Sequence, residues 1–146
     1  MSPELDLMIA IHLLHEVLEA QIEAADLDHS VPKNDFLMLV HLNEPKRMGA
    51  LAEDMHVLPS TLTAIADRLE GTGLIHRQRD PDDRRAWLLD ITDKGRALQS
   101  RIMGLSTEMF RSITGLTAEE IKTFDHLMQK VRSNIIERDG MQELMK

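Results

Sequence analysis

One stretch decides the fold: Pro59-Ser60-Thr61-Leu62-Thr63-Ala64-Ile65-Ala66-Asp67-Arg68-Leu69-Glu70. Its apolar residues recur at steps of three and four, which predicts a helix with one buried face. Pro59 suits a first helical turn, and Gly71 and Gly73 follow where glycine ends helices. The opposite face is left free to meet a partner. It offers Ser60, Thr61, Thr63 and Ala64, with Arg68 further along.

A second short helix is predicted immediately upstream, from Met48 to Met55, with a brief turn before Pro59. Two short helices joined by a tight turn are typical of a helix-turn-helix, whose second helix reads base edges in the major groove of DNA. Serine and threonine hydroxyls can contact phosphates or bases. The same residues also suit a capped surface helix that binds nothing, so this stretch alone leaves both interpretations open.

Downstream, the apolar pattern changes from a period of about 3.6 to a period of about 2. Residues 74–79 and 86–91 are therefore predicted strands, with Trp87, Leu89 and Ile91 on one face. The loop between them ends in Arg84 and Arg85, which a hairpin tip would carry into a narrow minor groove. Alternatively, the aspartates of the loop pair with these arginines on a solvated turn. The acidic residues are Asp80, Asp82 and Asp83.

Longer amphipathic helices flank this centre. One is predicted over about residues 4–26, a short buried helix follows Pro32, and Thr92 and the pair Thr117/Glu120 have the spacing of helix caps. The fold class is mainly α (α+β): a winged helix-turn-helix domain at 31–95, with residues 1–30 and 96–146 as a helical dimerisation region. A single chain would leave the apolar faces of the end helices partly bare, unless they pack on their own domain; two copies would cover them.

Composition narrows the classes of function. There is no cysteine, which excludes disulfides and thiol chemistry and suits a reducing cytoplasm. No apolar run reaches the roughly 20 residues of a membrane span, and the N-terminus does not resemble a signal peptide. The net charge is −8, yet residues 46–96 carry nine Lys or Arg and nine Asp or Glu. DNA contact is therefore expected in the central third, and the acidic ends would repel phosphates.

Several motifs, in order and at their spacings over about residues 48–95, resemble the MarR family of bacterial regulators. The segment 60–70 with Gly73-Leu74-Ile75 and Arg77 is similar to that family's recognition helix and its exit, and Leu51-Ala52 matches the pair before the turn. The wing signature is matched by Asp80-Pro81-Asp82-Asp83-Arg84-Arg85-Ala86, and the start of the next helix by Ile91-Thr92-Asp93-Lys94-Gly95. The terminal helices match in length and order only.

The resemblance implies a winged-helix homodimer on a roughly palindromic DNA operator. It assigns Arg85 to the minor groove, Arg84 to phosphate, and Asp67 and Asp83 to orienting the wing arginines. Ser60, Thr61 and Thr63 match recognition-helix positions. Ala64 stands where many relatives carry a long polar residue, which shifts readout toward hydroxyls, methyl contacts or DNA shape. Val31 replaces the family's threonine cap.

Family members often sense a small, frequently anionic aromatic effector in the cleft between the helical region and the winged domain. By position alone, the cleft candidates here are His12, His15, Phe36, His41 and Met48. His12 and His15 are three apart on one helix, a spacing compatible with metal. Without a third ligand in sequence reach we expect solvated or core histidines, and neither metal nor cofactor.

These observations predict a homodimeric, sequence-specific DNA-binding transcriptional regulator in the cytoplasm, a repressor released by a small molecule. The alternative is a winged-helix module for protein–protein contact, which would have no need of Arg84 and Arg85. An enzyme is not expected, because no nucleophile–base spacing, phosphate-binding loop or metal triad is visible.

Overall fold

The structure is a computed structural model that describes residues 1–25 and 31–138. Its elements follow the predicted order and confirm a mainly α fold with a small sheet. They are α1 (Pro3–Ala24), α2 (Lys33–His41), β1 (Lys46–Arg47), α3 (Met48–Met55), α4 (Pro59–Gly71), β2 (Ile75–Arg79), β3 (Trp87–Ile91), α5 (Asp93–Thr114) and α6 (Ala118–Glu137).

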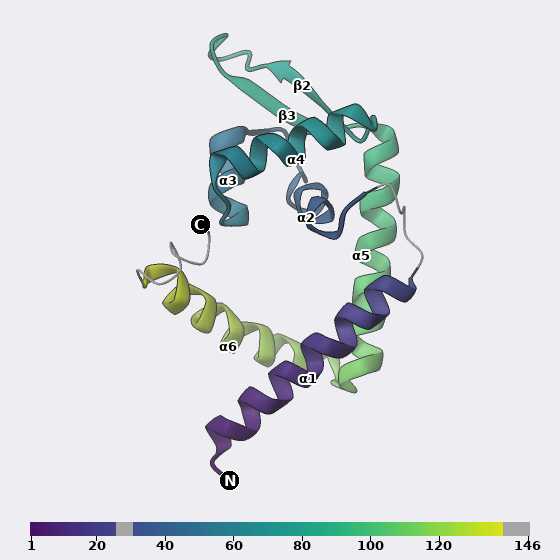
Figure 1. Cartoon of the computed structure of the whole chain (residues 1–146), viewed down its shortest axis with the longest axis vertical. Coiled ribbons are helices and arrows are strands. Elements are labelled where there is room, and N and C mark those ends of the chain that lie inside the picture. The colour runs from purple at the N-terminus through teal and green to yellow at the C-terminus, as the bar shows by residue number, and fades with distance from the viewer. Residues whose placement is uncertain (26–30, 139–146) are drawn as a thin grey trace.

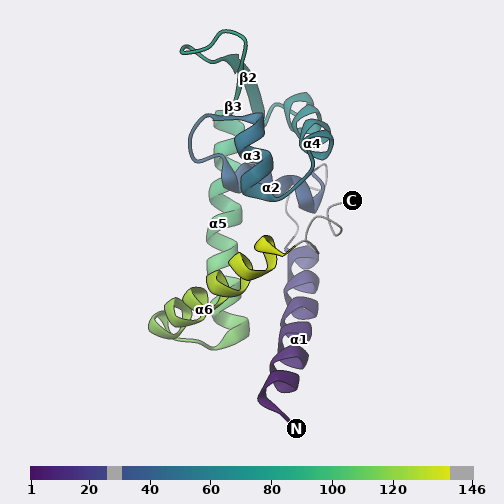
Figure 2. The ribbon, with the colours of Figure 1, turned by 90° about the vertical axis from the view of Figure 1, so that its left-hand side faces the viewer.

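Helix α5 is the long connector of the molecule. It joins a compact domain of α2, α3, α4 and the sheet to a region made by α1 and α6, and the far part of α5 lies beside α1 (Figure 1). The β2–β3 hairpin projects beyond the compact domain on the side opposite the N-terminus (Figure 2). This layout agrees with a winged domain over residues 31–95, a boundary that stays a prediction. Within the described residues, no helix has the length and apolar character needed to cross a bilayer.

The sheet has three antiparallel strands in the order β1-β3-β2. The hairpin is confirmed, with Ile75 opposite Ile91 and Arg79 opposite Trp87. Strand β1 was not predicted, since two residues carry no alternation. Leu89 and Ile91 are buried as expected, whereas Trp87 on the same strand is 43% exposed and lies under the guanidinium of Arg79 instead.

The core lies in the compact domain, where α4 inserts its apolar face. Leu62, Ile65 and Leu69 are each no more than 2% exposed, and they belong to one cluster with Leu39 and Leu51 of the preceding helices. At roughly 1.5–3 kcal/mol for each fully buried side chain, these three contacts position the helix strongly. The helix after Pro32, α2, is predicted to be buried. This prediction is wrong at Leu37, which is 53% exposed.

Local signals set the helix ends as predicted. The Thr92 side chain accepts a hydrogen bond from the Gly95 amide, and Thr117 and Glu120 form a capping box. At the end of α4, Gly73 adopts a positive φ of 77°, which lets its own amide reach the Glu70 carbonyl and the Leu74 amide reach the Leu69 carbonyl. These two bonds are the Schellman pattern, in which glycine avoids the strain that a Cβ would cause.

The glycines of α5 give a matched test of the packing beneath the hairpin. A Cβ at Gly95 would overlap the Leu74 carbonyl oxygen and lie 2.7 Å from Cγ1 of Ile91, whereas a Cβ at Gly104 would meet nothing within 4 Å. We expect Gly95→Ala to destabilise the fold by about 1–3 kcal/mol through overpacking. Gly104→Ala should stabilise it by up to about 1 kcal/mol through helix propensity. Urea unfolding measures both, and equal effects of the two substitutions would contradict the close approach.

Candidate nucleic-acid interface

The outward face of α4 is free along its first two turns. Ser60, Thr61, Thr63 and Ala64 are all exposed, opposite the buried face. The Thr63 hydroxyl donates to the Pro59 carbonyl at 2.9 Å, so its oxygen and methyl group remain for a partner. Leu58 stands at the N-cap and has no side-chain acceptor for the first amides of the helix. The start of α4 is therefore suited to an anion such as a phosphate.

The hairpin lies alongside α4, and the loop between its strands extends past the end at which α4 begins (Figure 1). Between them is a groove of about 580 Å³ lined by Met48, Thr63, Glu70, Arg77 and Trp87. A helix and a ribbon that flank one groove can meet adjacent grooves of a duplex while a sugar–phosphate strand passes between them.

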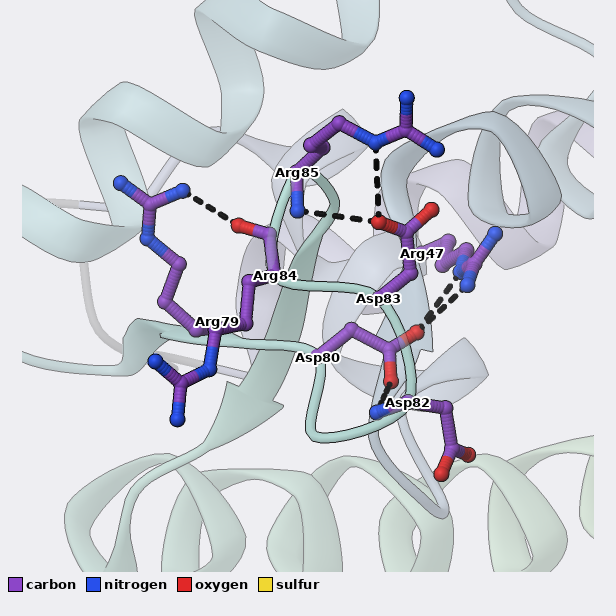
Figure 3. A network of polar contacts seen from close by, with 7 residues as sticks. All are labelled: Arg47, Arg79, Asp80, Asp82, Asp83, Arg84 and Arg85. Atoms are coloured by element: carbon purple, nitrogen blue, oxygen red, sulfur yellow. Dashed lines mark hydrogen bonds and ion pairs between the residues drawn. The ribbon is translucent and has the colours of Figure 1, made fainter.

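Asp80 anchors the loop of the wing from within. The residue is 6% exposed, and its Oδ2 accepts from Arg47 Nε at 2.9 Å and lies 2.7 Å from Arg47 Nη2. Its Oδ1 accepts from the Asp82 amide at 2.9 Å, as Figure 3 shows. These bonds, the Asp82 amide first and Arg47 second, lower the pKa of Asp80. Strand β1 therefore holds the wing through an ion pair in which the carboxylate is buried and the Arg47 side chain is 51% exposed.

Asp83 contacts Arg85, the arginine that the resemblance pairs with it. Its Oδ1 accepts from the Arg85 amide at 3.1 Å and from Arg85 Nε at 3.4 Å. The Arg85 side chain is nevertheless 94% exposed, and its terminal nitrogens point away from the loop (Figure 3). Arg84 is also exposed. The structure thus brings both arginines to the hairpin tip and leaves them able to donate.

Arg79 is a wing residue that the sequence did not reveal. Its guanidinium lies 4.3 Å from the centre of the Trp87 ring, and its Nη1 donates to the Arg84 carbonyl at 2.5 Å (Figure 3). A cation over an aromatic face is a stabilising contact. Arg47 was missed as well, because nothing in a linear pattern pairs residue 47 with residue 80.

Asp67 contacts an arginine of the wing strand rather than one of the hairpin tip. Its carboxylate accepts from Arg77 Nη2 at 2.5 Å, on β2, and not from either arginine of the hairpin tip. Glu70 lies 3.8 Å from the same guanidinium. Asp67 therefore ties α4 to the base of the wing, and it orients the tip only through the strand.

Arg68 also differs from the other predicted contact residues. Its guanidinium donates through Nε and Nη2 to the two oxygens of Asp35, at 2.9 and 2.8 Å, and the Asp35 side chain is fully buried. The hydrogen bonds that Arg68 donates to Asp35 raise the pKa of Arg68. The side chain is directed toward α2 rather than outward.

The five predicted effector residues do not form one site. Only Phe36 lines the cavity of about 360 Å³ between α1, α2 and α5. His12 and His15 are exposed on α1, and Met48 lines the groove beside α4. His41 lies near Lys46, and burial first, then Lys46, lower its pKa. Among the described residues no group of three potential ligands could hold a metal ion.

The residues that do line this cavity are mostly apolar. They come from the C-terminal end of α1, from along α2 and from the middle of α5. Periodicity could not have selected them, because the cavity forms only where the three helices converge. They include Ile22, Asn34, Leu37, Val40, Leu105 and Ser106.

Known proteins place this arrangement in a class of regulators. The model of the MarR family matches residues 31–87, which span α2, α3, α4 and the wing up to the start of β3. The HTH-type transcriptional repressor MdtR of Bacillus subtilis (strain 168) is 28% identical over 129 residues, covering 86% of this chain and 83% of that protein.

Solved structures agree with this class. The YusO protein of Bacillus subtilis is 30% identical, with a TM-score of 0.55, covering 91% of this chain and 99% of that one. AbsC of Streptomyces coelicolor, a MarR family transcriptional regulator, has a TM-score of 0.75 at 21% identity, covering 94% and 98%. The chain belongs to the MarR family of DNA-binding transcriptional regulators, and it is not an enzyme.

Acid should weaken the attachment of the wing loop, because the Asp80 carboxylate loses its charge. Because its pKa is lowered in the folded state, its contribution to stability is complete above the ordinary value of about 3.9 and is lost as pH falls through the lowered value. We expect Asp80→Asn to lower the melting temperature at pH 7 and to differ less from the wild type at pH 3, as followed by circular dichroism.

The control is Asp82→Asn, because Asp82 contributes its backbone amide to this network and its exposed carboxylate points away (Figure 3). It should melt like the wild type at every pH. A deficit for Asp80→Asn that is the same at pH 7 and pH 3 would contradict the role assigned to its charge.

Proposed function

We propose that this regulator is a homodimeric repressor that binds a pseudo-palindromic DNA operator and is released by a small-molecule effector. The observation that carries the DNA-binding part is the pairing of a free reading face on α4 with an arginine-tipped wing beside it. Ser60, Thr61, Thr63 and Ala64 would meet the major groove, and Arg85 the adjacent minor groove, with Arg84 on phosphate.

Dimer formation is supported by apolar side chains that a single chain leaves in water. On α1, Leu7, Met8 and Ile11 are 50–67% exposed, and on α6, Val131 and Ile135 are 46% and 43% exposed. Scattered exposed residues are ordinary, but rows of them along two long helices mark an interaction face. A second copy seated on them would set two reading helices about 34 Å apart, one turn of DNA.

The effector part rests on the cavity between α1, α2 and α5 and on the family resemblance. Its walls come from both the helical region and the winged domain, through Ile22 and Leu105 on one side and Phe36 and Val40 on the other. A small aromatic molecule fits such a volume and would change the angle between the two parts. We propose repression rather than activation, because the MdtR relative is named a repressor. Since the target is DNA, we propose a cytoplasmic location.

Replacing the wing arginine tests DNA binding. Arg85→Ala should weaken binding to a fragment selected from source-genome DNA by about 1–3 kcal/mol, roughly 5- to 150-fold, because a minor-groove contact is lost. Gel shift measures the affinity, and binding of the wild type should fall steeply between 50 and 200 mM salt as counterions are released. Arg101→Ala, which changes an exposed arginine of α5, is the control and should bind normally.

Undiminished binding by Arg85→Ala would remove the wing from the mechanism. A wild-type protein that retains no fragment at any salt concentration would instead favour the alternative of a protein–protein interaction module.

A charge placed on the terminal helices tests the dimer. Ile11→Glu, 50% exposed on α1 in the single chain, should give a monomer by light scattering at micromolar concentration, because a carboxylate would be buried without a partner. Leu58→Glu is the matched control, since Leu58 is also apolar and partly exposed (37%) but lies at the start of α4. A wild-type monomer, or a dimer that tolerates Ile11→Glu, would contradict this interface.

A further inference from the structure

The ion pair between α2 and α4 is the polar contact that the DNA-reading role does not account for. Arg68 presents Nε and Nη2 side by side to the two oxygens of Asp35, 2.9 and 2.8 Å away. Two parallel charge-assisted hydrogen bonds fix both the direction and the rotation of the groups they join. We call this contact the Asp35–Arg68 fork.

The Asp35 carboxylate depends on this partner. Its side chain is fully buried, whereas that of Arg68 is 49% exposed. Asp35 lies in the first turn of α2, where the helix dipole favours a negative charge, but a carboxylate without solvent also needs hydrogen-bond donors. The fork supplies two of them from the reading helix.

Position along α4 explains why the fork matters for DNA. Arg68 follows Ala64 by four residues and Thr61 by seven, so it shares their stripe on the helix surface. The apolar contacts of Leu62, Ile65 and Leu69 are not directional, whereas the fork is. A rotation of α4 about its axis would break the fork and would turn Thr61 and Ala64 away from the same duplex edge.

We propose that Arg68 is a positioning residue for DNA binding: its fork to Asp35 fixes the rotation of the reading helix, and it makes no contact with DNA itself. The proposal rests on the DNA-reading role of α4 given above. It also places α2 between the cavity and the reading helix, because Asn34 and Phe36, the neighbours of Asp35, both line that cavity.

Two conservative variants separate positioning from contact. Arg68→Lys keeps a positive charge but cannot form the two parallel bonds, and Asp35→Asn keeps the shape of the carboxylate but removes its charge. We expect each to weaken binding to the selected fragment about tenfold. The slope of log affinity against log salt should stay at the wild-type value, since no phosphate contact is lost. The double variant should bind no more weakly than the weaker single variant, because the fork is broken only once.

A direct phosphate contact gives the opposite pattern. Arg68→Lys would then bind much like the wild type, Asp35→Asn would bind equally or more tightly, and Arg68→Ala would lower the salt slope by about one. Any of these results overturns the proposal. Arg101→Lys, on the exposed surface of α5, controls for the exchange of arginine for lysine and should change neither affinity nor slope.

Folding is checked by circular dichroism at the assay temperature. If the single variants unfold, the pair Asp35→Leu with Arg68→Met replaces both charges by apolar groups, an exchange that buried ion pairs often tolerate. A folded double replacement that binds DNA about tenfold more weakly at the wild-type salt slope supports the proposal, and one that binds normally overturns it. A wild-type protein that binds no fragment would overturn the DNA-binding function itself, whereas wild-type binding with unaffected variants overturns only the fork.

Discussion

The structure depends on holding one face of α4 in the core while the other stays open. Leu62, Ile65 and Leu69 are buried almost completely, which fixes the depth of the helix and the face that it turns to the core. Arg68 joins α4 to α2, and Asp67 joins it to the base of the wing. These two ion pairs therefore tie α4 to its neighbours on both sides of the reading face.

The wing is also held by ion pairs, but here the carboxylates are the inner partners and an arginine remains exposed. Its loop is rich in aspartate, which ought to repel DNA, yet two of the three loop carboxylates have local partners. Asp80 is held by Arg47 and the loop backbone, and Asp83 by Arg85. The acidic residues thus serve as internal scaffolding, and the guanidinium of Arg85 is left 94% exposed at the tip. A neutral central third inside an acidic chain can present positive charge in this way.

The terminal helices α1 and α6 differ from the winged domain in that their apolar residues are not buried. Helix α1 buries none of its residues and α6 buries none either in the described part of the chain, although both have apolar rows. Their caps and lengths are sound by themselves, so what they lack is a covering surface. Because α5 links them to the winged domain, a change in the position of α1 or α6 would be carried to α4. The cavity beside α2 lies at that junction.

The sequence by itself determined the order of elements, the helix caps, the hairpin and the residues at its tip. These are local features, set by periodicity and by residues within one turn of each other. Only the tertiary structure decided the partners of charged residues: Arg68, a predicted DNA contact, pairs with residue 35, and Arg47 pairs with residue 80. The tertiary structure also places the five predicted cleft residues on different surfaces, and of these five Phe36 alone lines the cavity between α1, α2 and α5. The two ion pairs join residues 33 positions apart in the chain. The periodicity of a sequence does not predict which long side chains meet when helices pack.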